Sequence, residues 1–140
     1  MRSALLSGRE RGQAVSIMVL GFVAALLMVA GLVVDGGQKA AAMNRAETLA
    51  AGAARAGADA GAGSTLGTAS DTSVSAGQAR ISARNYLAAA GGDIASSRVQ
   101  VNGDQVSVHI EIRVTTVFLS LIHINTLRAT GDATARVVPN

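Results

Sequence analysis

The longest apolar run of the chain lies near its N-terminus. Residues 14–34 read AVSIMVLGFVAALLMVAGLVV and contain no charged side chain, no proline and no side-chain amide. At about 1.5 Å of rise per residue, a helix of this length is about 30 Å long and matches the hydrocarbon thickness of a bilayer. We therefore predict a transmembrane helix over residues 13–35, preceded by a basic leader over residues 1–12.

The charges that flank this run favour one orientation. Arg2, Arg9 and Arg11 precede it, and the first charged residue after it is Asp35. Positive flanking charge favours a cytoplasmic N-terminus, so we expect a single pass across the cytoplasmic membrane with the C-terminal domain extracytoplasmic. Two alternatives stay open. The run is an uncleaved anchor and nothing more, or it is a secretory signal that is cleaved near residues 40–42.

Alanine dominates the next part of the chain. Between residues 40 and 62, 12 of 23 residues are alanine, which has the highest helix propensity, so we predict a helical extension over residues 36–62. Small residues recur on one face of it: Ala42, Ala46, Ala50, Ala53 and Gly57. Such a face lets another helix approach closely, unless the alanines reflect composition alone. The glycine- and serine-rich residues that follow predict a linker over residues 63–74.

A second helix is predicted from Ser75 to Ala90, at the start of a small extracytoplasmic domain over residues 75–140. Ser75 and Gln78 have the spacing of a capping box, and Gly91-Gly92 is a helix-ending pair. One face of this helix is apolar: Ala79, Ala83, Tyr86, Leu87 and Ala90. This helix is expected to pack on a sheet.

Alternating valines and isoleucines predict that sheet. Val99 and Val101 alternate with polar residues, as do the apolar residues of 106–114, and Asn102-Gly103 between them is typical of a two-residue type I′ turn. That turn pairs Val101 with Asp104 and Val99 with Val106. Residues 127–137 continue the alternation as a third strand. The predicted fold is therefore α+β, with a long N-terminal helix, one further helix and a sheet of about three antiparallel strands.

An apolar segment, residues 117–124, interrupts the strands. Eight residues are too few to span a bilayer. One interpretation is a loop or short helix that closes the core. The other is an exposed patch, formed by Phe118, Leu119, Leu121 and Ile122, that docks on a neighbouring protein or on the membrane face.

Composition narrows the function classes. The 140-residue chain has no cysteine, which excludes disulfides, zinc–thiolate sites and a cysteine nucleophile. The formal net charge is +3, but no basic stripe is interleaved with aromatic residues, so no nucleic-acid binding is expected. His109 and His123 have no acidic or histidine neighbour at metal-ligand spacing. We therefore predict no catalytic, metal-binding or cofactor-binding residue, and a protein that is not an enzyme.

The residues at both edges of the apolar run carry a resemblance to a known family. Arg-Gly-Gln-Ala-Val at 11–15 leads into the run, and Val-Val-Asp-Gly-Gly at 33–37 ends it. An Ala-rich continuation at 46–54 and an alanine- and threonine-rich strand at 129–137 follow. In this order the segments resemble TadE/TadG-like proteins of the tight-adherence (Flp) branch of type IV pilus systems. The resemblance implies a minor pilin or a pilus-assembly protein of the bacterial cell envelope.

The same resemblance implies a processing site. In prepilin-like members of the group, a dedicated peptidase cuts after the glycine of the leader, which corresponds to the junction between Gly12 and Gln13. Many members carry a glutamate at the fifth mature position, where this chain has Ile17. A buried carboxylate is costly unless it meets a partner, and filament assembly can use that cost. Its absence suits a TadG-like or minor pilin-like subunit.

The expected partners are the membrane, other pilin-like subunits, assembly-platform proteins and a prepilin peptidase. Residue size points to Gly21, Ala25 and Gly31 as positions where a neighbouring helix approaches closely. The predicted function is that of a non-enzymatic, membrane-anchored subunit or assembly component of a Tad/Flp-type pilus or secretion system, which reaches the cell surface on assembly. The alternative is a monomeric signal-anchored or secreted envelope protein that binds a soluble or cell-wall ligand and joins no filament.

Overall fold

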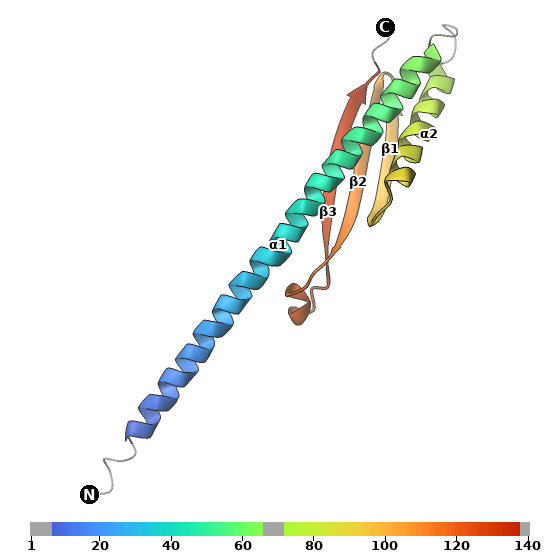
Figure 1. The fold of residues 1–140 in the computed structure, drawn as a ribbon. Helices are drawn as coiled ribbons and strands as arrows, with labels where there is room; N and C mark the ends of the chain where they lie inside the picture. The colour runs from blue at the N-terminus through green and yellow to red at the C-terminus, as the bar shows by residue number, and fades with distance from the viewer. Residues whose placement is uncertain (1–6, 66–71, 138–140) are drawn as a thin grey trace, which may run out of the picture.

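Two helices and a three-stranded antiparallel sheet make up the computed structural model, which describes residues 7–65 and 72–137 (Figure 1). The elements are helices α1 (Ser7–Thr65) and α2 (Thr72–Ala90), strands β1 (Ile94–Asn102), β2 (Gln105–Thr115) and β3 (Thr126–Arg136), and the 3₁₀ helix η1 (Leu119–Ile122) between β2 and β3. The predicted α+β fold is confirmed.

Helix α1 is continuous through the apolar run and the Ala-rich segment (Figure 1). It contains no proline, and alanine supplies helix propensity where bulky side chains are scarce. Because α1 ends at Thr65 and α2 begins at Thr72, both helices reach into the predicted linker. The rest of that linker, residues 66–71, lies outside the described residues, as do residues 1–6 of the predicted leader.

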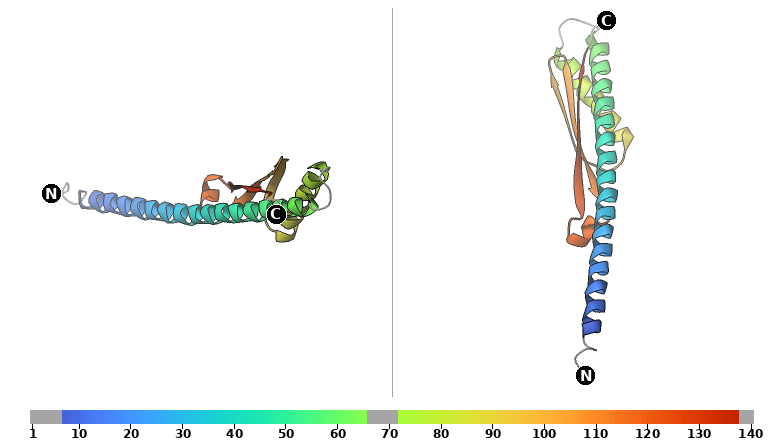
Figure 2. Two further views of the ribbon diagram at one scale, coloured as in Figure 1. Left: turned by 90° about the horizontal axis from the view of Figure 1, so that it is seen from above. Right: turned by 90° about the vertical axis from the view of Figure 1, so that its left-hand side faces the viewer.

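The helices form one layer and the sheet forms the other. The strand order is β1-β2-β3, with the C-terminal half of α1 packed across β3 and β2 and with α2 beside α1 and over β1 (Figures 1 and 2). The N-terminal half of α1 extends well beyond both layers (Figure 2). The Ala-rich part of α1 is therefore the main helix against the sheet, a place that the sequence analysis assigned to the second helix.

The core between the layers consists of small residues on the helices and larger aliphatic residues on the central strand. Its buried members are Ala46, Ala50, Ala53, Ala54 and Ala58 of α1, Ala79, Ala83 and Leu87 of α2, Val106, Val108, Ile110 and Ile112 of β2, and Ala129 of β3. Alanines on the helices let the backbones approach the sheet closely, so a core with few aromatic residues can still be well packed.

Gly131 of β3 marks the closest of these approaches. A Cβ atom at this position would lie 2.3 Å from the carbonyl carbon of Ala46 and 2.3 Å from the amide nitrogen of Glu47. Strand β3 thus touches the backbone of α1 directly, and no side chain larger than hydrogen fits between them.

The hairpin register differs from the predicted one. Asn102 pairs with Gln105 and Val101 pairs with Val106, so Gly103 and Asp104 form the turn and the predicted pairing of Val101 with Asp104 is wrong. Gly103 has a φ of 60°, and Asp104 has no positive φ, which is the pattern of a type II′ turn. This arrangement puts only a glycine at positive φ, whereas the predicted type I′ turn would also have put an asparagine there. The valines keep their predicted face because the shift is by two residues.

Helix α2 begins earlier than predicted and ends where expected. Ser75 lies inside the helix and its hydroxyl donates to the carbonyl of Gly61 at 3.2 Å, so the capping box predicted for Ser75 and Gln78 is wrong. Gly91, with a φ of 59°, follows Ala90, as the predicted C-terminal glycine should.

Candidate functional site

The N-terminal half of α1 presents an apolar surface that the described chain leaves almost entirely uncovered. Only 6% of its most apolar stretch of 18 residues is buried, so it is not a core helix of a soluble domain. Among the described residues this is one helix that is long and apolar enough to cross a membrane, by length and composition. The helix is consistent with a single membrane anchor.

The sequence-predicted residues of this half of α1 have different environments. Gly12 and Gln13 are exposed and helical. Gly21 and Ala25 are also exposed, and a Cβ atom added at Gly21 would meet nothing within 4 Å. Gly31 is buried instead, because Phe118 of the same chain lies against it. The open small-residue surface of the run is therefore at Gly21 and Ala25.

Asp35, the first charged residue beyond the run, is the most deeply placed polar side chain of this region, with 1% of its surface exposed. Its carboxylate accepts three consecutive backbone N–H groups, from Val117 at 2.9 Å, Phe118 at 3.1 Å and Leu119 at 2.7 Å. These are the donors that begin η1 and that the short helix itself leaves unpaired. Asp35 thus caps a helix that lies more than 80 residues away in the sequence.

Hydrogen bonding controls the ionisation of this carboxyl group. The N–H of Val117 lowers the pKa of Asp35 most, burial acts in the opposite direction, and the N–H groups of Leu119 and Phe118 lower it further, so that the pKa lies below its ordinary value. The side chain is therefore a carboxylate at neutral pH. A negative charge is also favourable at this end of η1, where the helix dipole is positive.

A glycine on the same stretch of α1 completes the contact. A Cβ atom at Gly31 would lie 2.5 Å from Cγ of Phe118, so the side chain of Phe118 rests on the backbone of α1. Gly31 and Asp35 are one helical turn apart and therefore lie on the same face. Together they hold the start of the apolar segment at the level of residues 31–35 of α1.

The apolar segment itself faces away from the core. It contains the short helix η1, as one of the two interpretations predicted, but η1 has no buried residue and does not close the core. Of the predicted patch, Leu121 is 79% and Ile122 is 63% exposed, while Phe118 is partly covered by Gly31 and Leu119 is half-buried. The patch is therefore centred on Leu121 and Ile122.

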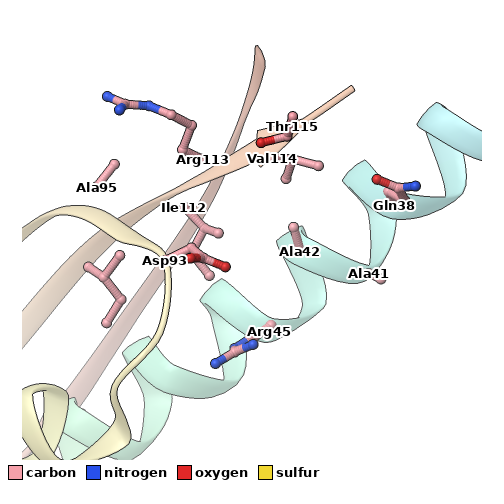
Figure 3. A pocket seen from close by; sticks show the side chains of 11 residues that line it. Gln38, Ala41, Ala42, Arg45, Asp93, Ala95, Ile112, Arg113, Val114 and Thr115 are labelled. Carbon is pink, nitrogen blue, oxygen red and sulfur yellow. The ribbon is translucent and has the colours of Figure 1, made fainter. Parts of the chain in front are cut away.

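An open cleft lies between α1 and the end of the sheet (Figure 3). Its volume is about 720 Å³. Ala42 and Arg45 line it from α1, and Ile112 and Thr115 line it from β2, whereas the side chain of Arg113 points away from α1 (Figure 3). The cleft has no convergent acid–base pair, and we assign no chemistry to it.

The histidines likewise show no reactive arrangement. Nδ1 of His109 lies 2.6 Å from a carboxylate oxygen of Asp132, its cross-strand neighbour on the exposed polar face of the sheet. His123 follows η1 with a φ of 66°. Within residues 7–65 and 72–137, no group of three or more histidine, aspartate or glutamate side chains is placed to hold a metal ion.

Sequence reasoning missed the role of Asp35. As the first charge after the apolar run and as part of Val-Val-Asp-Gly-Gly, the residue predicts only the end of a membrane segment. The available signal was the acid itself, placed directly at the end of a long apolar run. The partner is backbone, and backbone donors leave no trace in a sequence.

Comparison with known proteins agrees with the resemblance at the N-terminal part of the chain. Residues 12–60 match the Tad family model, described as "Putative Flp pilus-assembly TadE/G-like". The predicted resemblance is therefore confirmed over residues 12–60, whereas residues 129–137 lie outside the match. No curated protein and no solved structure matches the chain.

Proposed function

We propose that this chain is a non-enzymatic, membrane-anchored, pilin-like subunit or assembly component of a Tad/Flp-type pilus or secretion system. The observation that carries the proposal is the continuity of α1, which passes without a break from an uncovered apolar half into the core of an α+β domain. The family match over residues 12–60 covers this transition. A helix that is both anchor and core couples the position of the domain rigidly to the membrane.

In this proposal residues 14–34 span the cytoplasmic membrane with the N-terminus inside. The arginines before the run support that orientation. The large apolar side chains of the run are exposed in the isolated chain, which is stable in a bilayer but not in water. The domain formed by the rest of α1, α2 and the sheet then lies outside.

Assembly with other subunits would use the open face at Gly21 and Ala25. Small residues let a second helix approach closely within a membrane, where packing replaces the hydrophobic effect as the driving force. Because Gly31 is occupied by Phe118, it is not part of this proposed contact. Ile17 offers no carboxylate for a neighbour, so the contact would rest on packing alone.

Sequencing of the mature N-terminus tests the processing step of the proposal. Co-expression with a prepilin peptidase should yield a chain that begins at Gln13, and Gly12→Leu should abolish that cleavage. Gly36→Leu is the matched control, because Gly36 lies on the same helix with open space around it. A start at Met1 in the presence of an active peptidase favours the plain anchor, and a start near residue 40 favours ordinary secretion.

Cysteine cross-linking tests assembly. The chain has no cysteine of its own, so Gly21→Cys or Ala25→Cys introduces a unique thiol on the proposed contact face. Oxidation in cells that contain the other Tad components should give cross-linked species. Val23→Cys, on the opposite face of the same run and also exposed, serves as the comparison. Equal or absent cross-linking at all three positions contradicts a specific helix contact at Gly21 and Ala25.

A further inference from the structure

We propose that residues 117–124 form a second membrane contact, in which the apolar loop around η1 inserts into the lipid interface beside the end of the α1 span. The proposal rests on the membrane anchoring proposed above and adds a site to it. Its basis is the place of the loop along α1, its hydrogen bonding and the distribution of charge around it.

The contacts with α1 set the depth of the loop. Phe118 rests on Gly31, which lies inside the uncharged run, and Asp35 holds Val117 to Leu119 directly after the run ends. At about 1.5 Å per residue, Gly31 is only about 5 Å from the end of the run at Val34. When residues 14–34 fill the bilayer, the loop lies at the level of its outer interface. Figures 1 and 2 show η1 beyond the end of the sheet, beside α1 and on the side of its N-terminal half.

The side chains of the loop suit a lipid surface. Residues 117–124 read VFLSLIHI and carry no acid, lysine or arginine. The large apolar side chains exposed here are those of Val117, Phe118, Leu121, Ile122 and Ile124. These side chains continue the exposed apolar surface of the N-terminal half of α1. Lipid that covers this half of α1 therefore also reaches the loop.

Six of the eight backbone N–H groups of residues 117–124 have partners within the chain. Asp35 accepts the first three N–H groups of the loop. Within the loop, the N–H groups of Leu121, His123 and Ile124 donate to carbonyl groups, and the Ser120 hydroxyl donates to the carbonyl of Val117. Irregular backbone enters a lipid environment only when its polar groups have internal partners, because each unsatisfied group costs several kcal/mol there. Asp35 supplies the partners that the short helix lacks.

Basic side chains lie where the lipid headgroups are expected. Arg113 and Arg128 are cross-strand partners, two residues from the end of the sheet that bears the loop. Lys39 follows Asp35 by one turn of α1. Lys39 lies about 6 Å farther from the span than Asp35, and Arg113 and Arg128 lie about 7 Å from the end of the sheet, on the usual rises of a helix and a strand. Arg128 also pairs with Glu111 at 3.3 Å. An apolar tip with basic side chains farther from the span is typical of an interfacial membrane contact.

Depth-dependent fluorescence quenching tests the proposal on the full chain in lipid nanodiscs. The absence of cysteine allows one label at a time, through Leu121→Cys in the loop, Val23→Cys in the middle of the span, or Asp104→Cys in the hairpin turn at the opposite end of the domain. Position 121 is highly exposed, so the label does not disturb the fold. The probes are an environment-sensitive fluorophore, phosphatidylcholine with a quencher near the headgroup or deep in the acyl chain, and aqueous iodide.

The expected result separates the three positions. The emission of the label at 121 should be blue-shifted and quenched by the lipid with the headgroup-level quencher. The label at 23 should be quenched by the lipid with the deep quencher. The label at 104 should be quenched only by iodide. If 121 behaves like 104 while 23 is quenched by lipid, the loop contact is overturned and the anchor stands. If 23 is not quenched by lipid, the anchoring itself fails. If 121 is shielded only when several chains share a disc, its partner is a second copy and the lipid contact is overturned.

Discussion

The contact of Gly131 with the backbone of α1 leads to a prediction about Gly131→Ala. The substitution adds one methyl group at the point where β3 and α1 touch. We expect the α+β domain to lose stability while the apolar half of α1 is unaffected. The same change at a glycine with open space around it, such as Gly37, should have little effect.

The magnitude follows from the geometry. The new Cβ atom would lie 2.3 Å from the backbone of Ala46 and Glu47, whereas optimal contacts are about 3.5–4.0 Å, so strand and helix must separate by more than about 1 Å. Overpacking costs about 1–3 kcal/mol, and the upper end applies because both sides are backbone. Alanine lowers that cost by about 0.5–1 kcal/mol, because it loses less conformational entropy in a strand than glycine. The expected net loss is about 2 kcal/mol, or about 8–16 °C in melting temperature.

Thermal unfolding of the full chain in detergent or nanodiscs measures this effect. Far-ultraviolet circular dichroism follows the sheet and helices, and the emission of Tyr86, the one tyrosine in a chain without tryptophan, follows the packing of α2 on α1. Gly37→Ala is the matched control, since it makes the same chemical change on α1 with nothing within 4 Å of the new methyl group. A melting temperature for Gly131→Ala within about 2 °C of the unsubstituted protein, well below the expected shift, would refute the close approach of β3 and α1.

Two further predictions concern the core and the cap. Ile110→Ala should cost about 2–5 kcal/mol of unfolding free energy by emptying the centre of β2, whereas Ile122→Ala, at an exposed site, should cost little; equal losses in chemical denaturation would contradict the assigned core. Because the pKa of Asp35 is lowered by folding, its stabilising effect should be complete above the unfolded value of about 3.9 and be lost as the pH falls through the lower folded value. The NMR amide signal of Leu119 should therefore be constant down to about pH 4 and then shift, and a shift near neutral pH would contradict this assignment.

The buried carboxylate of Asp35 connects the end of the apolar run to the rest of the domain. Asp35 stands where the apolar run ends, and its ionised side chain is satisfied by the domain rather than by water. One residue thus joins the end of the apolar half of α1 to the segment that follows β2 and begins η1. A substitution there would change the placement of the apolar loop without touching the core.

Local sequence patterns are enough to predict the helices and strands of this protein and the apolar nature of its N-terminal half. Length and the absence of charge over residues 14–34 predict a span, and alternation predicts the strands, because both patterns depend only on neighbouring residues. The helical extension over residues 36–62 is likewise predicted from alanine content, and α1 runs three residues farther, to Thr65, into the predicted linker. The register of the hairpin was predicted two residues away from the observed one, because two adjacent turns fit the same alternation and only the cost of a positive φ separates them.

The tertiary structure decided how these elements are used. The alanine face of α1 packs on the chain's own sheet and on α2, which composition could not distinguish from a surface for another subunit. The pairs Gly31 with Phe118 and Asp35 with Val117 join residues more than 80 positions apart, and the close contact of Gly131 with Ala46 is of the same kind. Such contacts arise from the way two layers come together. A sequence records what each residue can do locally, whereas the backbone partner of a carboxylate or the space beside a glycine exists only after the chain has folded.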